Sequence, residues 1–207
     1  MTGDKWANPQ KMWDERFGQA EPVYGEQPNA YLRAQVHRLA PGGKILVPGD
    51  GYGRNGIWLA RQGFHVSTVD LSPVGVERAR KSAQAAGLAM SIEEADLGMW
   101  EWPVAEFDAV ASIFLHLPPA IRPRIHAQML GALKPDGLLI IEAFTPAQLQ
   151  HSSGGPKQAD LLYSAEILKK DFAAAELMEL LETELDLDEG RMHRGRAAVI
   201  HGVFRKT

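Results

Sequence analysis

The chain has 207 residues, of which 45% are hydrophobic and 23% are charged, values typical of one globular domain with a full core. No apolar run approaches the roughly 20 residues that a membrane-spanning helix needs. The N-terminal MTGDKWANPQ also lacks the apolar core of a secretory signal. The absence of cysteine excludes disulfides, thiolate metal sites and cysteine nucleophiles. We expect a cytoplasmic protein without membrane contact, either a monomer or a weak homodimer.

The formal net charge of −4 makes the chain a poor electrostatic match for a nucleic-acid backbone. Two basic clusters stand out, Arg78–Lys81 and Arg191–Arg196. The first has the spacing of a solvated helix face, whereas the second could hold one phosphate or carboxylate. We therefore expect a small-molecule partner and no nucleic acid.

Residues 1–31 contain several prolines and glycines and predict a covering segment with one short helix around Trp13–Phe17. The segment is rich in aromatic residues: Trp6, Trp13, Phe17, Tyr24 and Tyr31. Next, Tyr31–Leu39 has apolar residues on one helical face, and Pro41-Gly42-Gly43 ends that helix.

From residue 44 onward the pattern alternates between strands and helices. The predicted strands are Lys44–Val47, Phe64–Asp70, Ala89–Glu94, Phe107–Phe114 and Leu138–Ala143. The predicted helices between them are Gly53–Gln62, Ser72–Gly87 and Pro118–Leu133. This alternation indicates parallel strands joined by right-handed crossovers.

The alternation stops after residue 144. A long polar loop at Thr145–Tyr163 precedes a helix at Ser164–Ala175. Two strands, Glu176–Asp186 and Arg196–Arg205, then form an antiparallel pair. The predicted fold is α/β, a Rossmann-like, doubly wound, mostly parallel seven-stranded sheet with a C-terminal antiparallel hairpin. We expect one domain: a cap and first helix (1–40), a ligand-binding core (41–145), and a loop, helix and hairpin (146–207).

A glycine-rich loop lies between the first strand and its helix, where a doubly wound sheet binds nucleotide-like ligands. Residues 51–56 match the dinucleotide fingerprint G-x-G-x-x-G, and Gly49, Gly51 and Gly53 also fit a G-x-G-x-G loop. Glycine permits a tight turn there and close approach of backbone N–H groups to a ligand.

Two carboxylates follow the next two strands. Asp70 ends the second strand, 19 residues after Gly51, where a carboxylate accepts from ribose hydroxyls. Asp96 follows the third strand and precedes Leu97. An adenine-binding role there competes with an ordinary loop or N-cap role, and the order of all three motifs favours binding.

This order, completed by Phe107-Asp108-Ala-Val and Leu133-Lys-Pro-Asp-Gly137, resembles the motif series of class I S-adenosylmethionine-dependent methyltransferases over residues 41–145. Four further segments resemble the tellurite-resistance and thiopurine methyltransferase-like branch: Trp13–Phe17, Tyr24–Asn29, Ser112–Pro118 and Gly154–Lys157. One departure is Val47, where the family usually has an acidic residue that orders the loop. Asp50 is the candidate substitute.

The resemblance implies S-adenosylmethionine as the cofactor. The residues expected to bind it are Gly49, Asp50, Gly51, Gly53, Asn55, Asp70, Leu71, Ser72, Asp96, Leu97 and Ser112. Candidate catalytic residues are His116, Tyr24, Arg16 and His193. For His116 the alternative is a helix cap, for His193 a surface turn, and Glu142 either faces the acceptor or is a satisfied loop carboxylate. No histidine pair has metal-ligand spacing, so no metal is expected.

We therefore expect a methyltransferase acting on a small acceptor. That acceptor is an uncharged or soft nucleophile, such as a thiol, a selenium or tellurium species, or another xenobiotic or metabolite. The alternatives are an NAD(P)-binding oxidoreductase and a non-catalytic, donor-binding regulator. Against the oxidoreductase, the chain has no Tyr-x-x-x-Lys pair and no room for a substrate domain after the sheet.

Overall fold

The sheet of the computed structural model, which describes residues 8–207, has the strand order β3-β2-β1-β4-β5-β7-β6. Its strands are β1 (Lys44–Pro48), β2 (His65–Asp70), β3 (Ser91–Glu94), β4 (Phe107–Ile113), β5 (Leu133–Phe144), β6 (Ala175–Asp188) and β7 (Arg194–Lys206). Strands β1 to β5 are parallel, and β7 pairs antiparallel with both β5 and β6. The predicted sheet and its C-terminal hairpin are thus confirmed. The expectation for Trp6 lies outside the described residues.

The helices are α1 (Pro9–Phe17), α2 (Ala30–Gln35), α3 (Arg54–Arg61), α4 (Pro73–Ala85), α5 (Arg122–Ala132) and α6 (Ala165–Asp171). Three short 3-10 helices are η1 (Val36–Arg38), η2 (Pro146–Gln150) and η3 (Ala159–Leu161). No helix within residues 8–207 is both long enough and apolar enough to cross a membrane.

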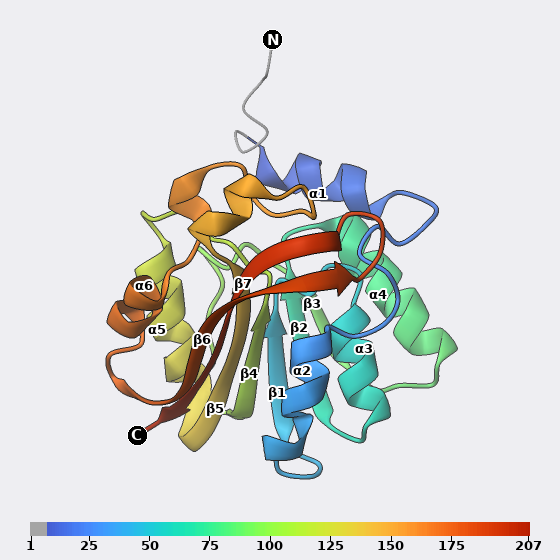
Figure 1. Cartoon of the computed structure of the whole chain (residues 1–207). Coiled ribbons are helices and arrows are strands. Elements are labelled where there is room, and N and C mark those ends of the chain that lie inside the picture. The colour runs from blue at the N-terminus through green and yellow to red at the C-terminus, as the bar shows by residue number, and fades with distance from the viewer. Residues whose placement is uncertain (1–7) are drawn as a thin grey trace.

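The core lies on both faces of the sheet because successive side chains of a strand point to opposite faces. In β1, Ile45 and Val47 belong to the cluster that contains residues of α2 and α3. Leu46 belongs to the opposite cluster, with residues of α5 and α6 (Figure 1). A sheet covered in this way leaves the carboxyl ends of its parallel strands as the place for a ligand.

Several boundaries differ from the prediction, and the two described next lie on either side of α5. Helix α5 begins at Arg122 rather than Pro118. The segment Lys134–Gly137, predicted to precede the fifth strand, belongs to β5 instead. It forms a bulge there, and the register shifts between Phe107 and Ala109 of β4. Asp136 has a φ of 63° in this bulge, which accommodates the extra residues of β5.

The long polar loop after β5 is anchored by a buried glutamine. The Gln148 carbonyl oxygen accepts from the Ala198 backbone N–H at 2.8 Å, and its amide donates to Ser153 Oγ at 3.0 Å. Ser153 donates in turn to the Arg196 carbonyl at 2.6 Å. The loop therefore docks on β7 through side-chain hydrogen bonds. The polar composition of the loop does not predict this docking.

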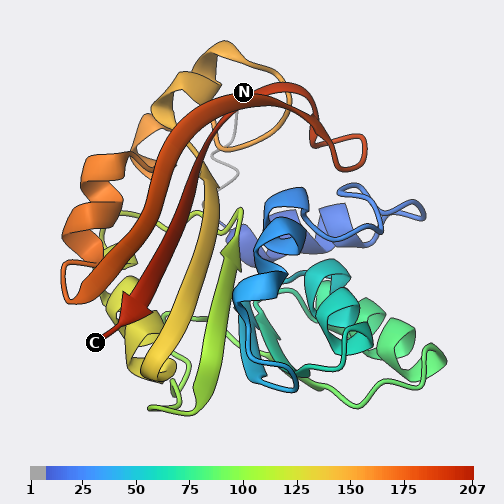
Figure 2. The same cartoon turned by 60° about the horizontal axis from the view of Figure 1, so that its bottom comes forward.

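The β6–β7 hairpin arches over the ends of the strands toward the N-terminal segment (Figure 2). Its hairpin tip, residues 189–193, meets that segment backbone to backbone. The Met192 N–H donates to the Val23 carbonyl at 3.0 Å. A Cβ on Gly190 would lie 2.3 Å from the Gly25 nitrogen, and the φ of Gly190 is 79°. Only glycine fits this contact.

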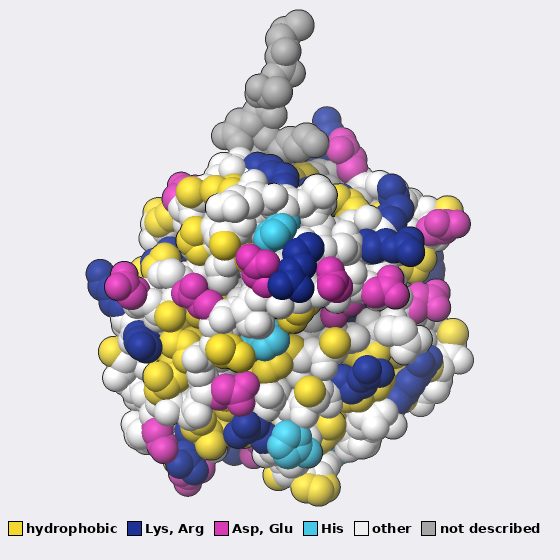
Figure 3. Space-filling model, viewed as in Figure 1, with side chains coloured by type: hydrophobic (Ala, Val, Ile, Leu, Met, Phe, Trp, Pro, Cys, Tyr) yellow, Lys and Arg dark blue, Asp and Glu magenta, His cyan; other side chains and the backbone are white. Residues whose placement is uncertain are grey.

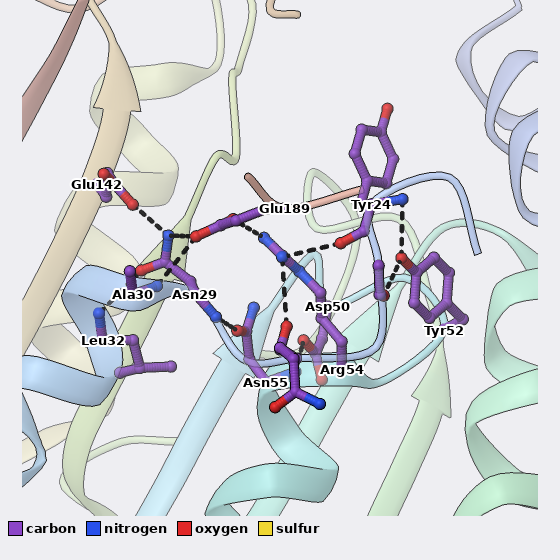
Figure 4. Close-up of polar contacts among 12 residues, drawn as sticks. Tyr24, Asn29, Ala30, Leu32, Asp50, Tyr52, Arg54, Asn55, Glu142 and Glu189 are labelled. Atoms are coloured by element: carbon purple, nitrogen blue, oxygen red, sulfur yellow. Dashed lines mark hydrogen bonds and ion pairs between the residues drawn. The ribbon is translucent and has the colours of Figure 1, made fainter. Parts of the chain in front are cut away.

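A buried polar network fixes the hairpin tip to the first helix after the glycine loop (Figure 4). The Arg54 guanidinium contacts Glu189 at 2.7 Å, and both side chains are less than a tenth exposed. Arg54 also donates to the Tyr24 carbonyl at 3.0 Å. The Asn29 amide donates to Glu142 and, at 3.0 Å, to Glu189. Three distant parts of the chain are thereby held in one geometry.

Removing one partner of this ion pair should be costly, because the other charge would remain buried and unpaired. We expect Arg54→Met to lower the free energy of unfolding by about 3–5 kcal/mol. Adding Glu189→Gln should recover part of that loss, since an amide oxygen still accepts from the Ala30 N–H that Glu189 now binds. Urea denaturation measures both effects.

The exposed pair between Arg205 and Glu176 provides the control. Arg205→Met should cost less than about 1 kcal/mol. An Arg54→Met loss as small as this control, or a double variant less stable than the single one, would contradict the interpretation.

Candidate functional site

A cavity of about 1070 Å³ opens over the carboxyl ends of the central strands, beneath α1 and the hairpin tip. Most residues that the sequence analysis singled out lie on its wall: Arg16, Tyr24, Gly49, Asp50, Gly51, Asn55, Asp70, Leu71, Asp96, Leu97, His116 and His193. They come from seven separate segments of the chain, which only the fold brings together.

The glycine loop is held by two buried carboxylates. Asp70 accepts from the Gly51 N–H at 2.8 Å and from the Ser72 N–H at 2.9 Å. Asp50 accepts from the Asn55 and Gly56 N–H groups at the start of α3. Burial raises the pKa of Asp50 to about 7 and that of Asp70 to about 6, against the backbone N–H bonds that lower both. Asp50 therefore orders the loop while Val47 is an ordinary buried core residue.

Gly51 serves helix packing as well as the loop turn. Its φ is 59°, and a Cβ there would lie 2.5 Å from the ring of Phe17. Phe17 of α1 therefore closes directly over the loop, with Trp13 stacked on it at 5.4 Å. The sequence predicted the tight turn, the ligand approach and the aromatic covering segment, but not the contact between Phe17 and Gly51.

Three predicted cofactor residues do not line the cavity. Gly53 instead forms the N-cap of α3 in a left-handed conformation. The Ser72 hydroxyl accepts from the Gly75 N–H and donates to Asp14, so it caps α4 and ties α1 down. Ser112 is buried within β4, and its hydroxyl has no hydrogen-bond partner among residues 8–207. These three residues do not line the cavity and instead belong to the helix starts and the strand next to it.

The other half of the cavity is aromatic. Phe114 follows β4 with a φ of 51°, a strained conformation for a bulky residue. Its ring stacks on Phe144 at 4.6 Å, and His193 lies 4.6 Å from Phe114 and 4.5 Å from Tyr24. The Tyr24 hydroxyl accepts from Arg16 at 3.0 Å.

His193 is a neutral imidazole inside this aromatic pocket. Burial lowers its pKa well below the usual value, and the positive charge of Arg54 adds to the effect. Its Nδ1 is buried and has no hydrogen-bond partner within residues 8–207. A buried nitrogen without a hydrogen-bond partner is costly, and this one is a rare exception within the site. The position of His193 agrees with its predicted place over the pocket.

His116 also lines the cavity, but its geometry opposes the predicted role as a catalytic base. Nδ1 lies 2.7 Å from the Leu161 carbonyl, and Nε2 accepts from the Phe144 N–H at 3.2 Å. Burial lowers its pKa to about 4. Both ring nitrogens are thus engaged by the backbone, and the residue joins the loop before α6 to the end of β5. His116 therefore has a structural role, but it bridges two backbone groups and does not cap α5, the helix-cap alternative of the sequence analysis.

Glu142 is a second correction. It is buried and accepts from Asn29 and from His201, whose Nε2 lies 2.9 Å away. Glu142 does not line the cavity, so of its two predicted roles the structure favours a hydrogen-bonded carboxylate over one that faces the acceptor. Within residues 8–207 no group of three or more His, Asp and Glu side chains is placed to hold a metal ion.

The state of His116 generates a pH prediction. Because its folded pKa lies below its unfolded value, its contribution to stability is present above about pH 6.5 and is lost as the pH falls toward 4. We expect the free energy of unfolding of the wild type to lose about 2–3 kcal/mol more than that of His116→Gln over this range.

Asp50 and Asp70, whose pKa values are raised, act in the opposite direction over the same range, so the difference between the two proteins is the quantity to measure. Urea denaturation at half-unit pH steps provides it. Parallel curves for the two proteins would show that His116 is not held neutral.

Comparison with known proteins agrees with this geometry. Residues 45–137 match the methyltransferase domain family. A probable thiol methyltransferase 2 of Arabidopsis thaliana is 34% identical over 120 residues, which are 56% of this chain and 51% of that protein. A thiopurine S-methyltransferase of Gluconobacter oxydans is 36% identical over 69 residues, 32% of this chain and 31% of that protein. The chain thus spans about half or less of the length of these curated relatives.

Solved structures share the fold over nearly the whole chain. TehB from Haemophilus influenzae superposes with a TM-score of 0.70 at 19% identity, covering 96% of this chain and 67% of TehB. A protein whose structure describes the conversion of a disulfide bond into a thioacetal group in echinomycin biosynthesis has a TM-score of 0.77 at 22% identity, covering 96% and 93%.

The glycine loop, the buried Asp70 and the fold together fit S-adenosylmethionine, the cofactor that this family implies. Residues 45–137 form an S-adenosylmethionine-dependent methyltransferase domain, and the chain is similar to thiol and thiopurine methyltransferases and shares the fold of TehB.

Proposed function

We propose that the protein methylates a compact soft nucleophile, such as a thiol, from S-adenosylmethionine. The observation that carries this proposal is a single cavity that joins the carboxylate-held glycine loop to an aromatic pocket around His193. The names of the thiol and thiopurine relatives support the same class of acceptor. When bound, the cofactor supplies a methyl group activated by the positive charge on its sulfur.

Three residues are placed to hold the donor. Asp70 Oδ2 accepts from the Gly51 N–H and Oδ1 from the Ser72 N–H, and the carboxylate retains lone-pair capacity for a ribose hydroxyl. Asp96 uses Oδ1 for the Gly98 N–H at 2.7 Å, which leaves Oδ2 for an amino group. Arg16 lies over the Trp13 ring at 4.8 Å and has no carboxylate within 4 Å among residues 8–207, so it suits the carboxylate of the donor.

The aromatic pocket is placed to align the acceptor. In the proposed step a bond forms between the acceptor sulfur and the methyl carbon while the bond from that carbon to the donor sulfur breaks. The electron pair of the broken bond stays on the leaving sulfur. The thiol proton passes to the imidazole of His193, which lines the cavity, and then to solvent, which gives the residue a role only with acceptors that are protonated.

The shape and charge of the molecule favour a small acceptor over a polyanion. The cavity lies between α1 and the hairpin tip, a covered space that suits a compact molecule. On the face shown in Figure 3, acidic and basic side chains are interspersed and form no continuous basic stripe. Extended nucleic acid needs such a stripe to follow its backbone.

Donor binding gives the first test. We expect Asp70→Asn to weaken adenosylhomocysteine binding about tenfold or more, because the ribose hydroxyls lose a charged acceptor. Asp108→Asn is the matched control, since Asp108 contacts Lys44 at the opposite end of the strands. Calorimetry measures both dissociation constants. Equal affinities for a folded Asp70→Asn protein and the wild type would refute the assigned donor site, as would tighter binding of NAD than of adenosylhomocysteine.

Methyl transfer to benzyl mercaptan gives the second test. We expect His193→Ala to lower kcat/KM about 100-fold at pH 7 while the affinity for adenosylhomocysteine stays unchanged. The deficit should shrink as the pH rises above about 8.5, where a thiol ionises without help. Radiolabelled transfer measures it. A deficit that does not change with pH would assign His193 a packing role. Methyl transfer to nucleic acid, with none to thiols, would contradict the proposed acceptor class.

A further inference from the structure

The carboxylates on the cavity wall all lie in one half of it. The wall contains three carboxylates, Asp50, Asp70 and Asp96. All three follow the carboxyl ends of β1, β2 and β3, the half of the sheet that the proposed function gives to the donor. Carboxylates there suit ribose hydroxyls, an amino group and a cationic sulfur.

Two exposed basic side chains lie in the opposite half, whereas Arg16 and Arg54 lie on the donor side. Lys157 lies in the loop after β5, and Arg191 lies in the hairpin tip; both line the cavity and both are exposed. Neither has a carboxylate within 4 Å among residues 8–207, and Lys157 donates only a long bond of 3.3 Å to the His151 carbonyl. The cavity wall near them therefore holds positive charge that the protein leaves without a counter-ion.

Arg191 differs in this respect from its neighbours on the same hairpin. Arg194 pairs with Asp188 at 3.9 Å, and Arg196 pairs with Glu184 at 3.1 Å. Arg54 of α3, which contacts the hairpin tip, is neutralised by Glu189. Arg54, Arg194 and Arg196 thus have carboxylate partners, whereas Arg191 has none among residues 8–207.

The two cations belong to one rim because their loops are in contact. A Cβ on Gly154, three residues before Lys157, would lie 2.5 Å from the Met192 carbonyl and 2.7 Å from the His193 ring. The loop that carries Lys157 therefore packs directly on the hairpin tip that carries Arg191. Beneath this contact lie the rings of Phe144 and His193, 5.4 Å apart.

We infer that the methyl acceptor carries a carboxylate, which Lys157 and Arg191 hold at the rim while its thiol lies beside His193. The inference rests on the proposed function and names the charge of its substrate. The donor has one carboxylate, for which Arg16 is the partly buried candidate, so the two rim cations remain for the acceptor. Such a contact at an exposed rim selects among acceptors more than it adds affinity.

The test compares 4-(mercaptomethyl)benzoate with 4-(mercaptomethyl)benzamide, which has the same shape without the charge. Calorimetry on the protein saturated with adenosylhomocysteine measures binding, so the result does not depend on turnover. We expect the benzoate to bind about tenfold more tightly than the amide. The preference should decline with added salt, because exposed charges are screened.

The double variant Lys157→Gln/Arg191→Gln should lose this preference, and Arg194→Gln, on the same hairpin and already paired, should keep it. Equal binding of the benzoate and the amide by the wild type would overturn the inference. So would a double variant that weakens adenosylhomocysteine but spares methylthioadenosine, which lacks the carboxylate, because the cations would then serve the donor. Benzoate preference without any methyl transfer would support the charge assignment and count against the proposed function instead.

Discussion

The buried ion pair between Arg54 and Glu189 sets the position of almost everything that closes the cavity. Arg54 stands one residue after the glycine loop, so its backbone is fixed by the turn that Asp50 and Asp70 hold. Its guanidinium reaches both Glu189 of the hairpin tip and the carbonyl of Tyr24. A charge taken out of water tolerates little displacement of its partner, because the attraction must offset the cost of desolvation. The two covering segments are therefore held relative to the loop.

Two histidines that look alike in the sequence differ in what their ring nitrogens contact. His116 and His193 both line the cavity, and burial lowers the pKa of each. His116 spends both ring nitrogens on backbone groups of the core. His193 is carried by the hairpin tip, where the ring lies among the rings of Tyr24 and Phe114 and Nδ1 has no hydrogen-bond partner within residues 8–207. Both histidines therefore lie on the cavity wall, but only His193 has a ring nitrogen without a hydrogen-bond partner among residues 8–207.

The parts that could be predicted from the sequence are those governed by local patterns. Strand periodicity, the helical pattern of Ser72–Gly87 and the order of glycine loop, Asp70 and Asp96 are short-range signals. They correctly predicted the sheet, and Asp70 and Asp96 lie on the wall of one cavity. The Asn29 contacts with Glu142 and Glu189 span 113 and 160 residues, and nothing in the sequence around either glutamate marks them. The ring of Phe17 over Gly51 and the strained backbone of Phe114 are equally invisible to periodicity.

The central claim is that donor and acceptor share one preformed cavity whose cover is fixed by the buried network. A crystal structure with adenosylhomocysteine tests it most directly. The account predicts the ribose at Asp70, the adenine at Asp96 and the sulfur facing His193, with the Arg54–Glu189 pair intact and the hairpin tip in place. A ligand bound elsewhere, or one that enters only when this pair breaks and the tip swings away, would contradict it.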